Sequence, residues 1–125
     1  MRYMLMIYGD PAAYGKMSEQ ERNADFGAYM TFNQEVVARG VLRSGEQLHP
    51  APMATTVRVR DSKTLLTDGP FAETKEVLGG FYIVDCASLD EAVEWAAKLP
   101  ASWTGSVEVR PLIELDQATR SGAEA

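Results

Sequence analysis

The chain has 125 residues, of which 46% are hydrophobic, and its formal net charge is -6. This length fits one domain with a substantial core, and the hydrophobic content excludes a disordered chain. The acidic balance argues against nucleic-acid binding, which needs clustered lysine and arginine, and against attraction to an anionic membrane surface. A small molecule, including a small anion, is still compatible with this charge.

The chain contains one cysteine, Cys86, and one histidine, His49. An intrachain disulfide and a cysteine-based zinc site are therefore excluded. The apolar segment 1–8 is too short to span a bilayer and lacks the three-part pattern of a signal peptide. We therefore expect a reduced, cytoplasmic protein that uses neither a metal nor another cofactor.

The first half of the chain predicts a strand, a helix and a second strand. Residues 2–8 are an apolar run that ends at turn residues, which is typical of a strand, and residues 41–48 are interpreted as a second strand that ends in a turn-rich segment. Ser18 and Glu21 form a capping box that opens the helix, and Gly40 ends it. One apolar stripe of this helix is expected to face the core, formed by Phe26, Met30 and Val37 with Tyr29 and Val36 alongside.

The second half repeats this order after an inserted hairpin. Residues 55–60 alternate between apolar and polar side chains, and residues 63–67 run back from a short turn, which predicts two antiparallel strands. The remaining elements follow in chain order: a loop over 68–76, a strand over 80–85, a second capping box at Ser88 and Glu91 with its helix, and a last strand over 106–113.

This order is the ferredoxin-like β-α-β-β-α-β pattern of an α+β fold, with a hairpin inserted in the middle. Its helices cover one face of the sheet and leave the other face open. The strands at 2–8 and 80–85 are apolar on both faces, so the open face needs a cover. A second copy of the chain is the economical cover, which predicts a homodimer, and the chain's own hairpin is the alternative. One domain is expected over residues 1–115, followed by a flexible tail over 116–125.

Two motifs carry a family resemblance: DGPFAETKE over residues 68–76, followed by GGFY over 79–82, and the closing strand VEVRP over 107–111. They resemble the DGPF-domain family, a branch of the YCII-related proteins, and the resemblance extends to about Leu115. It implies a dimeric α+β barrel whose two sheets pack face to face, and a functional link to an extracytoplasmic-function sigma factor system. It also implies a His–Asp pair as the active site. Asp68 lies inside the matched motifs, whereas His49 lies outside them.

Asp68 is the leading candidate for a functional residue. Gly69 and Pro70 would hold its carboxylate rigidly, and partial desolvation beside Phe71 would suit it for general acid or base chemistry. Asp-Gly and Gly-Pro are also ordinary turn residues, so a purely structural turn is the competing interpretation, and turn chemistry alone favours it.

Charged residues outside this turn complete the candidate site. Lys75 would neutralise a substrate anion that Glu73 orients, although a solvated run of charges explains both residues more simply. Arg110, in the closing motif, and Arg43 lie on predicted strands, where a guanidinium can clamp a carboxylate. His49 is a further candidate base, against its simpler interpretation as an exposed loop residue.

Together these residues favour a small-molecule-binding homodimer with a pocket formed by the dimer. Its ligand-contacting residues would be Gly69, Pro70, Phe71, Glu73, Lys75, Arg43 and Arg110. The alternative is a small cofactor-free enzyme of isomerase, lyase or hydrolase type, in which Asp68 is the general acid or base.

Overall fold

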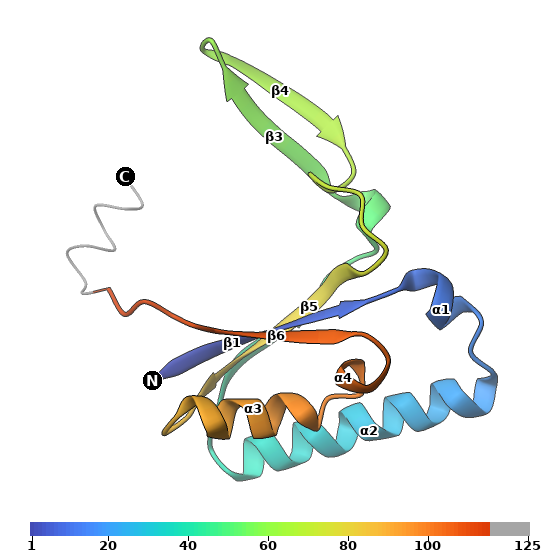
Figure 1. Cartoon of the computed structure of the whole chain (residues 1–125), viewed down its shortest axis with the longest axis vertical. Helices are drawn as coiled ribbons and strands as arrows, with labels where there is room; N and C mark the ends of the chain where they lie inside the picture. The colour runs from blue at the N-terminus through green and yellow to red at the C-terminus, as the bar shows by residue number, and fades with distance from the viewer. Residues whose placement is uncertain (116–125) are drawn as a thin grey trace.

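Four antiparallel strands form the main sheet of the protein, in the order β2-β5-β1-β6 (Figure 1). The computed structural model describes residues 1–115, so the predicted tail over 116–125 lies outside the described residues. The strands are β1 (Arg2–Gly9), β2 (Leu42–Gln47), β5 (Val77–Asp85) and β6 (Ser106–Pro111).

The helices α2 (Glu19–Ala38), α3 (Leu89–Ala97) and α4 (Ala101–Thr104) lie on one side of this sheet (Figure 1). Two short helices, α1 (Pro11–Gly15) and α4, were not predicted, because a helix of one turn has too few residues to show a periodic pattern. A 3₁₀ turn, η1 (Ala51–Met53), precedes the hairpin. Within residues 1–115, no helix is long and apolar enough to span a membrane.

The capping boxes explain where the long helices begin. The Ser18 hydroxyl accepts from the Glu21 amide at 3.0 Å, and the Glu21 carboxylate accepts from the Ser18 amide at 3.1 Å, as predicted. Only half of the second box forms. The Ser88 hydroxyl accepts from the Glu91 amide at 3.2 Å, but the Glu91 carboxylate accepts from the amide of Ala87, one residue before the cap.

The inserted hairpin forms a separate two-stranded sheet from β3 (Thr55–Arg60) and β4 (Lys63–Asp68). Its register pairs Thr55 with Asp68 and Arg60 with Lys63. In Figure 1 the hairpin extends away from the main sheet, on the side opposite to α2 and α3. The order of elements therefore agrees with the predicted α+β pattern, including the insertion.

The core lies between the sheet and the helices, and Phe32 is at its centre. The Phe32 ring lies 4.9 Å from the Tyr82 ring and 5.9 Å from the Trp95 ring, measured between ring centroids. The Tyr82 hydroxyl donates to the Asn33 side chain at 2.8 Å, so a polar atom at the edge of the core has a partner. The largest fully buried side chains in the described part of the chain are Leu5, Phe32, Val36, Val84 and Leu99.

The predicted core stripe of α2 is wrong for three of its five residues, although Val36 is buried and Tyr29 packs against the core, as predicted. Phe26, Met30 and Val37 are 43–67% exposed, whereas Phe32 and Val36 are buried. Successive helix residues are about 100° apart, so these two sets occupy different sectors of the same helix. The sector with Phe32 faces inward because its ring fits between the aromatic side chains of β5 and α3.

Tyr29 on α2 gives the fold an alkaline sensitivity. Burial raises its pKa to about 12, from an ordinary value of 10.0. The folded state favours the protonated phenol, so protonated Tyr29 stabilises the fold. This stabilisation is complete below the pKa of the phenol in the unfolded chain and is lost as the pH rises through its pKa in the folded chain. We expect Tyr29→Phe to lose less stability than the wild type between pH 10 and pH 12, as measured by urea unfolding. Equal losses in the two proteins would contradict this assignment.

Candidate functional site

The face of the main sheet opposite the helices has an apolar centre. Tyr3 and Leu5 of β1 are buried against the helices, so the alternate residues Met4 and Met6 face the other side. Their register partners on β5 are Ile83 and Phe81, which share that face. We call these four residues, Met4, Met6, Phe81 and Ile83, the open face. All four are half-buried within the single chain.

Charged side chains from β6 adjoin the open face. Arg110 is the register partner of Met4, and Glu108 is the register partner of Met6. Arg110 and Glu108 form an ion pair, and the Arg110 side chain is largely exposed. The apolar open face is therefore flanked by the accessible guanidinium of Arg110, and a guanidinium binds carboxylate and other oxyanions.

The motif that begins at Asp68 closes the base of the hairpin. Asp68 is the last residue of β4, and the next amide, that of Gly69, donates to the Ala54 carbonyl at 2.6 Å. The Thr56 hydroxyl donates to the Gly69 carbonyl at 2.8 Å. These bonds tie the end of β4 to the start of β3, while the Asp68 side chain is exposed to solvent.

Gly69 has a φ of +94°, a conformation that residues with a Cβ rarely adopt. We expect Gly69→Ala to destabilise the base of the hairpin by about 1 kcal/mol or more. The readout is faster amide hydrogen exchange over residues 55–68, because the hairpin lies outside the main core. Gly27→Ala, inside α2 with open space around it, is the matched control and should not change this exchange. Equal exchange in Gly69→Ala and the wild type would contradict the assignment.

The rest of the DGPF motif runs from the hairpin to the start of β5. Phe71, Glu73 and Lys75 are exposed. The Glu76 carboxylate accepts from the Ser106 hydroxyl at 2.8 Å, which ties the end of the motif to β6. Sequence reasoning did not assign a role to Glu76, although its place in the motif was a signal.

The structure places Arg43 far along the sheet from this motif. The Arg43 guanidinium donates to the Gly40 carbonyl at 2.9 Å and to the Asp85 carboxylate at 3.4 Å. Asp85 ends β5, whereas the DGPF motif leads into the first residue of that strand, Val77. A bond from the Met1 ammonium lowers the pKa of Asp85, and the Arg43 charge adds to this effect. Within one chain, Arg43 and Asp68 are not brought together.

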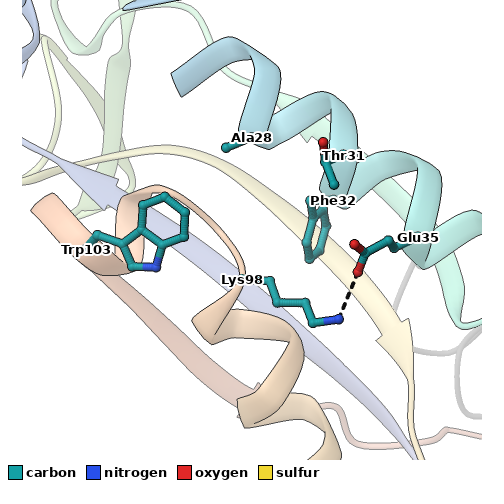
Figure 2. Close-up of a pocket in the computed structure, with 6 residues that line it drawn as sticks. All are labelled: Ala28, Thr31, Phe32, Glu35, Lys98 and Trp103. Carbon is teal, nitrogen blue, oxygen red and sulfur yellow. Dashed lines mark hydrogen bonds and ion pairs between the residues drawn. The ribbon is translucent and has the colours of Figure 1, made fainter. Parts of the chain in front are cut away.

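Two shallow grooves mark other parts of the surface. His49 lines one of about 310 Å³ with Gln47, Leu48 and Pro50, and Asp68 is not among its lining residues. The other, of about 370 Å³, lies in the helical layer (Figure 2). In this second groove the Lys98 ammonium lies 2.8 Å from the Glu35 carboxylate, and Figure 2 marks this ion pair with a dashed line. The residues that line this groove are Ala28, Thr31, Phe32, Glu35, Lys98 and Trp103. None of them is a candidate site residue from the sequence analysis.

Cys86 is a buried core residue, and burial raises the pKa of its thiol. This environment suits packing rather than nucleophilic chemistry. Across residues 1–115, no group of three or more histidine, cysteine, aspartate or glutamate side chains is arranged to hold a metal ion.

The fold and the open face define a small α+β protein with an antiparallel sheet, covered by helices on one face. The chain belongs to the YCII-related domain family, whose model matches residues 1–116. It is 40% identical over 114 residues to the Uncharacterized protein R00369 of Rhizobium meliloti (strain 1021), a match covering 90% of this chain and 92% of that protein. The predicted YCII relationship is confirmed.

A solved structure has a similar fold. It is the 5-chloro-2-hydroxyhydroquinone dehydrochlorinase (TftG) from Burkholderia phenoliruptrix AC1100, in complex with 2,5-dihydroxybenzoquinone. The TM-score is 0.52 and the sequence identity 15%, over 92% of this chain and 96% of that chain. At this identity the likeness concerns the fold alone.

Proposed function

We propose that the protein is a homodimer that binds a small molecule in a pocket between two open faces. The observation that carries this proposal is the apolar open face beside Arg110. Met4, Met6, Phe81 and Ile83 form a contiguous apolar surface on the side of the sheet that the helices leave bare. Such surfaces in small proteins mark interaction or binding sites.

The chemistry of the open face favours a small, flat anion as the ligand. Apolar side chains would contact a ring, and the Arg110 guanidinium would bind an acidic oxygen. Lys75 and Glu73, on the loop at the end of the sheet, would add charge at the rim of the pocket. The complex of the similarly folded dehydrochlorinase with 2,5-dihydroxybenzoquinone supports this class of ligand.

The test is a thermal-shift titration with 2,5-dihydroxybenzoquinone and a panel of aromatic acids. We expect at least one of these compounds to raise the Tm of the wild type. Arg110→Ala should bind that compound at least about tenfold more weakly, because a charge-assisted bond is lost. Lys98→Ala, which removes an exposed cation from the helical layer, is the control and should bind as the wild type does. Equal binding by Arg110→Ala would contradict the proposal.

A second candidate function is cofactor-free catalysis with Asp68 as general acid or base. The place of Asp68 at the start of the DGPF motif favours it, although its exposed carboxylate lacks the partial desolvation beside Phe71 that the sequence predicted. The catalytic activity of the similarly folded dehydrochlorinase also supports it.

Asp68→Asn separates this candidate from the binding function. Asparagine serves in turns as aspartate does, so the variant should stay folded and dimeric. If Asp68 transfers protons, turnover of any compound that stabilises the wild type falls by about two orders of magnitude. Unchanged turnover would exclude Asp68 as the acid or base, and the binding function would stand without it.

A further inference from the structure

The hairpin has an apolar face that its own chain leaves exposed. Val57 and Leu66 are register partners, and Val59 lies two residues along the same face. These three side chains are 58–68% exposed, and every residue of β4 is exposed. We call Val57, Val59 and Leu66 the apolar hairpin face. An isolated two-stranded hairpin is only marginally stable in water, so this face needs a partner.

The other face of the hairpin is basic. Arg60 and Lys63 are register partners, and Arg58 lies on the same face two residues before Arg60. The hairpin is thus a cationic segment of a chain with a formal net charge of -6. A basic outer face suits a hairpin that packs by its apolar face, because the cations stay in solvent on the side away from the second copy.

Hydrogen bonds close the base of the hairpin. The bonds from Gly69 to Ala54 and from Thr56 to Gly69 hold the two strands together where they leave the main sheet. Pro50, Pro52 and Pro70 restrict the backbone on both sides of this base. The two strands of the hairpin are therefore held as one unit, and prolines stiffen the segments that join it to the main sheet.

The direction and length of the hairpin favour contact with a second copy. Figure 1 shows that it extends on the side of the sheet opposite to α2 and α3, which is the side of the open face. Six-residue strands span about 20 Å, whereas stacked sheets lie about 10 Å apart. If the sheet of a second copy is stacked on the open face of the first, a hairpin of this length on the first copy extends beyond that second sheet.

We infer that the hairpin is an arm that packs its apolar face against the second copy of the chain. This inference rests on the proposed homodimer. Each hairpin would then form a side wall of the pocket between the two sheets, and the loop at its base, residues 68–71, would lie at the pocket rim. The pocket would be incomplete in a single chain, because its floor and its side wall come from different copies.

The test compares two aspartate substitutions at adjacent residues of β4. Leu66→Asp puts a carboxylate on the apolar hairpin face, and Thr67→Asp puts the same charge on the opposite face. Sedimentation equilibrium should show a dimer dissociation constant at least about tenfold higher for Leu66→Asp, because a buried carboxylate would be left unpaired. Thr67→Asp should change it less than about threefold. Equal effects in the two variants, or no effect of Leu66→Asp, would overturn the inference.

Hydrogen exchange provides a readout that does not depend on a substitution. Amides of residues 55–68 in the wild type should exchange at least about tenfold faster below the dimer dissociation constant than above it. Exchange that is independent of concentration would overturn the arm.

A Met6→Asp variant, altered on the open face, distinguishes the two proposals. If Met6→Asp dissociates the dimer and Leu66→Asp does not, the proposed dimer stands and the arm is wrong. If the wild type is a monomer, the proposed function itself has failed.

Discussion

Replacing Phe32 by alanine should lower the free energy of unfolding by about 3–5 kcal/mol, which is the range for large-to-small substitutions of core aromatics. Phe32 is 1% exposed, and its ring contacts Tyr82 and Trp95. Truncation would remove the contacts that join α2, β5 and α3 and leave a cavity between them. Urea unfolding at one fixed protein concentration is the measurement, because dimerisation would make stability depend on concentration.

Phe26→Ala is the matched control for this substitution, since Phe26 lies on the same helix and is 67% exposed. We expect it to change the free energy of unfolding by less than about 1 kcal/mol. If the two substitutions cost the same, the sector of α2 that faces the core has been assigned incorrectly.

Replacing Met6 by aspartate should weaken dimerisation by about three orders of magnitude or more. In an isologous dimer each substitution appears twice, so two carboxylates would enter the interface without partners. The single chain should still fold, because Met6 faces away from the helices and its replacement remains solvated in the monomer. Sedimentation equilibrium measures the change.

Val93→Asp is the control for Met6→Asp. Val93 is an exposed residue of α3, in the helical layer on the other side of the sheet. The same charge placed there should leave the dissociation constant unchanged. Equal weakening by the two variants would point to a general effect of charge and against an interface at the open face.

Local signals predicted most of the fold. The capping box of Ser18 and Glu21 and the alternation over residues 55–60 act over a few residues, so the sequence shows them directly. The orientation of α2 depends instead on Tyr82 and Trp95, which are distant in the sequence. Without those contacts, the sequence could not show which of the two apolar sectors of α2 faces the core.

The candidate site was predictable in part, for the same reason. The motif at Asp68 and Gly69 was visible in the sequence, but its bonds to Ala54 and Thr56 depend on how the hairpin closes. The apolar character of the open face followed from the strands at 2–8 and 80–85. That Arg110 lies beside this face, while Arg43 bonds to Asp85 at the end of β5, depends on strand register.

The measurement that tests the central claim most directly is the mass of the wild-type protein in solution. The chain has a mass of 13.7 kDa. Light scattering at micromolar concentration should give twice that value, because the open face of one copy would cover that of the other. A mass of 13.7 kDa under the same conditions would contradict a pocket shared between two copies.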